Sequence, residues 1–114
     1  MQVKDLSPEK FEELLSTKTN ALIVKFGATW CGPCKKIAPY LHGKLATKKN
    51  VGFLDIDVDE NYDLYSAMKR KKIVTKLPTI LHYSTDNTDF YPTFSVVGVN
   101  PKMVDEMFNQ IEDP

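Results

Sequence analysis

The sequence has no excess of charge and no long apolar run, and each absence excludes a class of protein. Its 114 residues carry 15 basic and 15 acidic side chains, so the formal net charge is zero. Neither half is dominated by one sign, which argues against the broad basic surface of a protein that binds nucleic acid or an anionic membrane. No apolar stretch approaches the roughly 20 residues that span a bilayer. Partners must therefore be selected by shape and local contacts.

Cysteine is also scarce, and no secretory leader is recognisable. The chain has two cysteines, and the segment from Met1 to Pro8 lacks the apolar core of a signal peptide. Together these features predict a reducing compartment, and we expect a cytoplasmic location. The length suits one compact domain over residues 1–114 and is too short for two ordinary ones.

The two cysteines lie in the pentapeptide Trp-Cys-Gly-Pro-Cys at residues 30–34, between an apolar run and a helical pattern. Thiols separated by two residues can close a small disulfide ring, and Pro33 restricts the backbone between them. If a helix begins at Cys31, its unpaired N–H groups and the positive end of its dipole favour the thiolate. The spacing therefore predicts a redox pair in which Cys31 is the nucleophile and Cys34 its partner.

Two other roles for the cysteines stay open. A permanent structural disulfide would close a very short loop, which removes little chain entropy and stabilises weakly. A zinc site would need His42 and His82 as further ligands, and neither histidine has the spacing of a zinc finger. We therefore expect no metal.

Helical and strand patterns alternate along the chain. The patterns predict helices at 8–16, 34–46, 61–71 and after Asn100, and strands at 21–26, 51–58, 79–83 and 90–97. The first two strands and the helix between them form a βαβ unit with parallel strands. Pro92 places the last strand at a sheet edge. The cysteines then lie at the carboxyl edge of the sheet, where open α/β folds place their chemistry.

The chain resembles the thioredoxin family over residues 3–112. The matching segments are residues 22–26, 28–35 and 51–59, Leu77-Pro78-Thr79 and Val97-Gly98, in the order that the family has them. The resemblance implies the thioredoxin fold, an α/β/α sandwich of three layers whose central mixed sheet is flanked by about four helices. Segments 62–76 and 84–94 are less typical of the family.

The resemblance also implies an activity, reduction of disulfides in partner proteins. Cys31 thiolate attacks a partner disulfide to form a mixed disulfide, and Cys34 then attacks Cys31 and releases the reduced partner. An NADPH-dependent flavoprotein, a thioredoxin reductase, would restore the dithiol. We expect a monomer without a bound cofactor.

Residues outside the pentapeptide core receive roles from the same resemblance. Pro78 matches the family's cis-proline, although an ordinary loop proline before a strand is the alternative. The backbone of Leu77 would pair with an extended substrate segment. The substrate-contact residues implied in total are Trp30, Gly32, Pro33, Leu77, Pro78 and Gly98.

Lys25 departs from the family, which usually has a buried Asp at this position in the strand. That Asp is thought to handle the proton of the second cysteine, and a lysine cannot serve as the same base. We hypothesise that Lys25 lies beneath Cys34 and either favours its thiolate by charge or, as the neutral amine, accepts its proton. A pair with Asp55 would lower the cost of burial. The alternative is that Lys25 reaches solvent along the sheet edge and tunes nothing.

Two other functions compete with disulfide reduction. A disulfide isomerase or oxidant is kept in view by Lys25, because a stabilised reduced form makes an oxidant. A binding or scaffolding subunit could use the same fold with incidental thiols, docking through segments 62–76 or 84–94. The Gly-Pro pair between the cysteines resembles a thioredoxin reductant more than a glutaredoxin or an oxidising isomerase.

Overall fold

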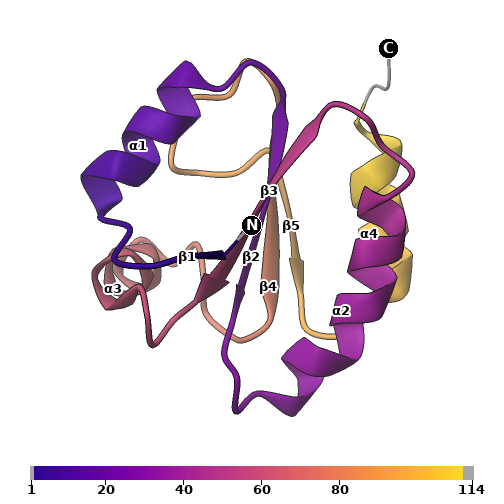
Figure 1. Ribbon diagram of the computed structural model, residues 1–114, viewed down its shortest axis with the longest axis horizontal. Helices are drawn as coiled ribbons and strands as arrows, with labels where there is room; N and C mark the ends of the chain where they lie inside the picture. Colours follow the sequence, from indigo (N-terminus) through magenta and orange to yellow (C-terminus); the bar gives the residue numbers. More distant parts are fainter. Residues whose placement is uncertain (1, 112–114) are drawn as a thin grey trace.

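The computed structural model describes residues 2–111 as a five-stranded sheet with helices on both faces (Figure 1). The strand order across the sheet is β1-β3-β2-β4-β5. In chain order the elements are β1 (Gln2–Val3), α1 (Pro8–Thr17), β2 (Ala21–Gly27), α2 (Gly32–Leu45), β3 (Val51–Asp57), α3 (Tyr62–Arg70), β4 (Thr79–Tyr83), β5 (Phe94–Val97) and α4 (Pro101–Asn109).

The sheet is mixed, as expected. Strands β1, β3 and β2 run parallel, whereas β4 is antiparallel to β2 and β5 is antiparallel to β4. Helices α1 and α3 cover one face of the sheet, and α2 and α4 cover the other (Figure 1). This arrangement confirms the predicted three-layer sandwich and the parallel βαβ unit, and it places the end of β2 and the start of α2 at one edge of the sheet.

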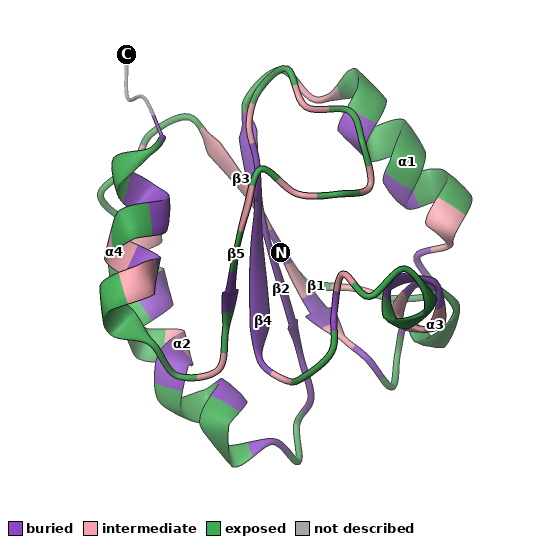
Figure 2. Ribbon diagram, turned by 180° about the vertical axis from the view of Figure 1, so that it is seen from behind, coloured by how far each residue is buried: buried purple, intermediate pink, exposed green. Residues whose placement is uncertain are grey.

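Strand β2 lies at the centre and is buried along its whole length (Figure 2). Its side chains alternate between the two cores, because successive residues of a strand point to opposite faces. Val24 and Phe26 pack in the core with α1 and α3, whereas Ile23 packs in the core with α2 and α4. Lys25 therefore follows Ile23 on the face covered by α2 and α4.

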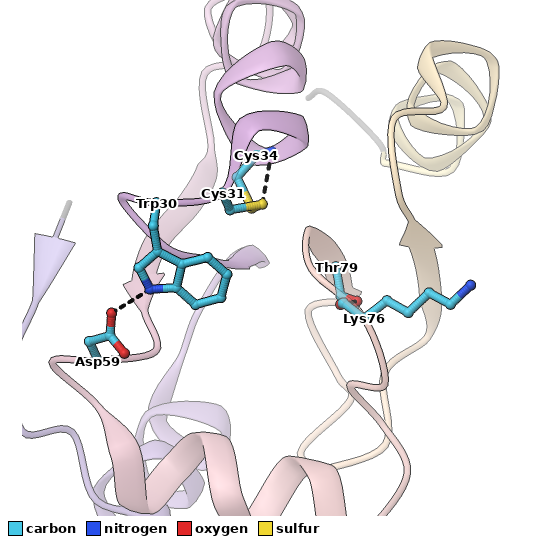
Figure 3. The surroundings of a disulfide bond; sticks show 6 residues. All are labelled: Trp30, Cys31, Cys34, Asp59, Lys76 and Thr79. Atoms are coloured by element: carbon cyan, nitrogen blue, oxygen red, sulfur yellow. Dashed lines mark hydrogen bonds between the residues drawn. A yellow bond between two sulfur atoms is a disulfide. The ribbon is translucent and has the colours of Figure 1, made fainter.

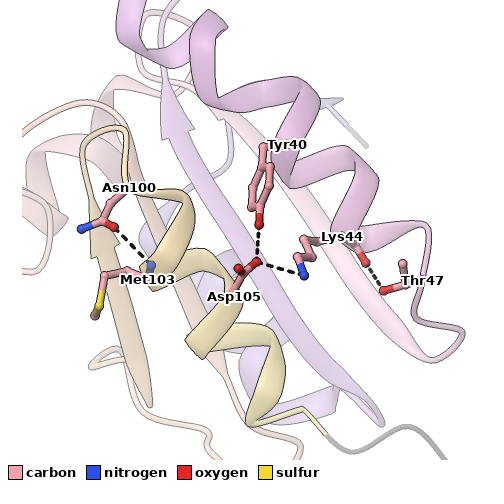
Figure 4. Close-up of polar contacts among 6 residues, drawn as sticks. All are labelled: Tyr40, Lys44, Thr47, Asn100, Met103 and Asp105. Carbon is pink, nitrogen blue, oxygen red and sulfur yellow. Dashed lines mark hydrogen bonds and ion pairs between the residues drawn. The ribbon is translucent and has the colours of Figure 1, made fainter.

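Helix starts follow the capping residues that the sequence indicates. Ser7 Oγ accepts a hydrogen bond from Lys10 N at 3.1 Å, with Pro8 as the first residue of α1. Asn100 Oδ1 likewise accepts from Met103 N at 3.2 Å (Figure 4). Each cap satisfies a backbone donor that the helix itself leaves unpaired.

Helices α2 and α4 are joined by a polar cluster on the surface (Figure 4). Tyr40 donates its hydroxyl hydrogen bond to Asp105, and Lys44 Nζ lies 2.9 Å from the same carboxylate oxygen. Hydrogen bonds from Tyr40 and then Lys44 lower the pKa of the Asp105 carboxyl, and the bond to Asp105 raises the pKa of Tyr40. The cluster fixes the C-terminal half of α2 to α4.

Two parts of the fold differ from the prediction. Strand β1 was not expected, and it is held by Asn61, whose side chain donates to Val3 O and accepts from Leu6 N, both at 2.9 Å. The last strand begins at Phe94 instead of residue 90, so the predicted boundary is wrong. Residues 84–93 form a loop instead, because side-chain hydrogen bonds satisfy its backbone, among them Tyr83 Oη to Phe90 O at 2.7 Å.

Candidate active site

The cysteine pair lies where β2 passes into α2, as the sequence predicts. Cys31 caps the N-terminus of α2, and Cys34 lies in its first turn. The two are joined by a disulfide with their Cα atoms 5.3 Å apart, within the usual range for such bonds (Figure 3). Gly32 and Pro33 between them are exposed. The pair is therefore presented at the carboxyl edge of the sheet.

The Cys31 sulfur lies at the N-terminus of α2, next to a backbone N–H donor and the positive end of the helix dipole. Cys31 Sγ accepts a hydrogen bond from Cys34 N at 3.2 Å. Pro33, the second helical residue, has no N–H, so the donor at Cys34 is the one that the side chain serves. Such donors, together with the helix dipole, favour a thiolate over a thiol at this position.

The two cysteine residues are not equally exposed. Cys31 is 6% exposed and Cys34 is 2% exposed, so Cys34 lies behind its partner. An approaching molecule therefore meets Cys31 first, while Cys34 remains covered but within bonding reach.

A second wall of the site is formed by the segment before β4 (Figure 3). The peptide bond between Leu77 and Pro78 is cis, and Pro78 O accepts from Gly98 N at 2.8 Å. Thr79 Oγ1 donates to Lys76 O at 2.6 Å, which fixes the segment on its other side. No hydrogen bond joins the backbone of Leu77 to another described residue. One stretch of backbone facing the site thus remains without an internal partner.

Apolar side chains are exposed around the cysteines. Trp30 is 68% exposed, and its indole Nε1 donates to Asp59 Oδ2 at 2.8 Å (Figure 3). Val97 and Val99 are 44% and 42% exposed on either side of Gly98, which has a φ of 79°. Asp59 and Val99 were not predicted as site residues from the sequence. Asp59 could have been predicted from the topology. It follows β3, which is parallel to β2, so it lies at the same end of the sheet as the cysteine pair.

Lys25 is buried at 6% exposure in the central strand. It lies opposite Asp55 in the register between β2 and β3, and both line a pocket of about 420 Å³ with Cys34. Neither Lys25 nor Asp55 takes part in an ion pair with a described residue, so the direct pair suggested by the sequence is not formed. The alternative, in which Lys25 reaches solvent along the edge of the sheet, is wrong, because β2 lies between β3 and β4.

The histidines lie away from the cysteine pair. His42 is exposed on α2, with its ring edge-on to Phe53 at 5.8 Å. His82 is 2% exposed in β4 opposite Ile23, towards the far end of β2, and burial is the main cause that lowers its pKa. Residues 2–111 contain no group of three or more His, Cys, Asp or Glu side chains placed to hold a metal ion.

Within the same residues, no helix has the length and apolar character needed to cross a membrane.

A disulfide-forming cysteine pair capping a helix at the edge of a mixed α/β/α sheet defines a thiol–disulfide oxidoreductase. Comparison with known proteins agrees. The sequence model of the Thioredoxin family matches residues 2–111. The chain therefore belongs to the thioredoxin family, whose members act through a redox-active cysteine pair.

Individual relatives show how far the similarity extends. Thioredoxin of Mus musculus is 46% identical over 70 residues, which cover 60% of this chain and 67% of the mouse protein. Thioredoxin-2 of Saccharomyces cerevisiae is 32% identical over 98 residues, 86% of each chain. The X-ray structure of Fasciola hepatica thioredoxin superposes with a TM-score of 0.76 at 26% identity, covering 98% of this chain and all of the other.

Proposed function

We propose that this oxidoreductase reduces disulfides of partner proteins, with Cys31 as the attacking and Cys34 as the resolving residue. The observation that carries the assignment is the position of Cys31 at the helix start, where its Sγ accepts a helix N–H and where the residue is more exposed than Cys34. Cys34, by contrast, is nearly inaccessible to a partner.

The exchange consists of two displacements in which electrons and protons balance. Cys31 thiolate attacks one sulfur of the partner disulfide, whose S–S bond breaks, and the departing sulfur takes up a proton. Cys34 then loses its proton and attacks Cys31 Sγ. The mixed disulfide breaks, and the second partner sulfur leaves and is protonated. The cysteine pair has then lost two electrons, and the partner has gained them.

The substrate would bind as an extended segment beside the backbone of Leu77. Its backbone N–H and C=O have no hydrogen-bond partner among the described residues, so they are available for pairing of the kind that adds a strand to a sheet edge. Apolar contact would come from the surface around the cysteines, formed by Trp30, Gly32, Pro33, Pro78 and Gly98.

The remaining assignments concern the setting of the reaction. We propose that residues 1–114 act as one domain and as a monomer, in the cytoplasm. The oxidised pair has to be reduced after each turnover, and an NADPH-dependent thioredoxin reductase is the donor that the family membership supports.

A trapping experiment tests the cysteine roles. With Cys34→Ser, partners should remain attached to Cys31 as mixed disulfides that dithiothreitol releases, because no second thiol resolves them. Cys31→Ser is the matched control and should trap none. Equal capture by both variants through contacts that reductant does not break would contradict disulfide exchange and favour a scaffolding role.

Turnover is measured separately by insulin reduction with NADPH and a thioredoxin reductase. Reduction with dithiothreitol but not with the reductase would keep the chemistry and reject this electron donor.

A disulfide isomerase or oxidant remains the second candidate, and the burial of a lysine near Cys34 favours it. The reduction potential separates the two candidates, since an oxidant has the higher value.

A further inference from the structure

A larger cavity lies at the end of the sheet opposite the cysteine pair. Its volume is about 1030 Å³, and Ala21 at the start of β2 lines it, whereas Gly27 at the end of β2 lies beside Cys34. The length of β2 separates these two ends by about 20 Å. This distal cavity is therefore remote from the exchange chemistry, and it is large enough for a small organic ligand.

Hydrogen-bonding side chains from several separate segments line the distal cavity. They come from the segment before β2, the residue before β3, the loop after β4 and the end of α4, and they include Thr19, Asn20, Asn50, Ser84, Asp86 and Gln110. Ala21 and Ile111 add apolar contact. The hydroxyl and amide groups among these side chains both donate and accept hydrogen bonds. Segments distant in the sequence thus bring mostly neutral polar groups to one space.

A buried histidine with an unpaired nitrogen also lines the distal cavity. His82 is 2% exposed, and among the side chains of residues 2–111 its Nδ1 is the fully buried polar atom that has no hydrogen-bond partner. Buried polar groups are nearly always paired, so an unpaired one indicates a missing partner. Gln110, which is exposed after α4 and lines the same cavity, hydrogen-bonds to this ring.

The distal cavity offers little net charge to a ligand. Burial is the main cause that lowers the pKa of His82, so the ring is neutral at neutral pH. Asp86 is the charged side chain in the lining, and its Oδ1 accepts a hydrogen bond from Ser84 Oγ at 3.0 Å. Lys18 lies close enough to attract Asp86, but its ammonium group donates to Thr85 O at 3.0 Å. An anion therefore meets no free cation there, and the attraction of Asp86 for a cation is partly offset.

We propose that the distal cavity binds a neutral polyhydroxyl molecule, a sugar or polyol, with His82 at its base. A hydroxyl group both donates and accepts, so it can pair with Nδ1 in either tautomer of neutral imidazole and with the amides of Asn20 and Asn50. Ionised carboxylates only accept and ammonium groups only donate, so each would leave part of the lining unpaired. Movement of the exposed Gln110 side chain uncovers Nδ1 for the ligand.

The test is an NMR titration of the full oxidised chain with glucose, methyl glucoside and glycerol. The His82 ring signals and the backbone amide signals of the cavity residues should shift and then saturate. Thermal stability is not the readout, because sugars stabilise proteins without binding to them. Binding of glucose alone would indicate a free sugar, whereas equal binding of methyl glucoside would indicate the end of a glycan, and both support the site. Inorganic phosphate and methylammonium are the charged probes and should give no saturable shift.

Three substitutions assign the binding to the distal cavity. His82→Phe keeps an aromatic ring in the core, removes Nδ1 and should weaken sugar binding by about tenfold. His42→Phe is the matched control, since His42 is exposed on α2 and does not line the cavity, and it should bind as the parent chain does. Asn50→Ala changes an exposed residue of the lining, so it leaves the core intact and should weaken binding several-fold. This second variant decides the question even if His82→Phe does not fold.

Shifts that rise in proportion to sugar concentration without saturating would overturn the proposal. Saturable binding that His82→Phe and Asn50→Ala both leave unchanged would overturn it as well, as would tighter binding of phosphate or methylammonium than of any sugar or polyol. The cavity and the cysteine pair share no residue, so Cys31→Ser should bind sugar with the affinity of the parent chain. Sugar binding and insulin reduction therefore succeed or fail independently.

Discussion

The hydrogen bond from Cys34 N to Cys31 Sγ can be tested with two substitutions that differ by one oxygen atom. Cys31→Ser keeps an acceptor at the cap of α2, and Cys31→Ala removes it. Both variants lack the disulfide and the proposed nucleophile, so their difference isolates the cap. In the structure the sulfur accepts at 3.2 Å from a donor in the first turn that has no other partner.

The size of the difference follows from burial. Replacing a serine cap by alanine costs about 1 kcal/mol, within a range of roughly 0.5–2. Cys31 is 6% exposed, so water replaces the lost acceptor poorly and the upper half of that range applies. We expect the serine variant to be more stable by about 1–2 kcal/mol, a factor of roughly 5–30 in the unfolding equilibrium.

Urea titration of both variants, with reductant present because Cys34 remains, gives the comparison. Equal denaturant slopes would show that the unfolded states are alike, and the serine midpoint should lie higher. An alanine variant as stable as the serine variant would contradict a stabilising hydrogen bond at this cap. The helix start would then not hold an acceptor at residue 31, and the argument for a stabilised thiolate there would lose its main support.

Three further substitutions test other contacts. Gly27→Ala places a methyl group 3.2 Å from Cys34 Sγ, and we expect this overpacking to cost the oxidised protein about 1–3 kcal/mol in urea titration. An unchanged midpoint would mean that the sulfur moves aside. Tyr83→Phe removes the donor to Phe90 O at 2.7 Å and should cost about 1 kcal/mol, measured as a lower Tm, whereas an equal Tm would contradict it. Burial lowers the pKa of His82 below its ordinary 6.5, so the unfolded chain binds a proton that the folded chain resists, and stability should fall as the pH drops through 6.5. His82→Leu should flatten this decline, and an equally steep decline would show that another group causes it.

The layers and the cysteine pair were predictable because their signals are local. An apolar run predicts the central strand, Pro8 and Asn100 mark helix starts, and the spacing of Cys31 and Cys34 is short enough for their geometry to follow from the helix between them. These features depend on neighbours within a few residues, so the sequence pattern carries them.

The unpredicted features depend on contacts between distant segments. Strand β1 has two residues, too few for any periodicity, and it is held by Asn61, which lies beyond the C-terminal end of β3 and is distant from β1 in the sequence. The late start of β5 follows from side-chain bonds within its loop. Alternation along β2 places Lys25 on one face of the sheet, but its distance from Cys34 depends on how α2 packs over that face.

The pocket lined by Cys34 and the exposed apolar surface share no residue, and this separation has a consequence for the order of events. A docked partner would occupy the front of the cysteine pair while the rear stays open to water. Cys34 could then release its proton through the rear opening without any part of the complex having to move away. The proton loss that precedes release of the partner would thus not require the partner to dissociate first.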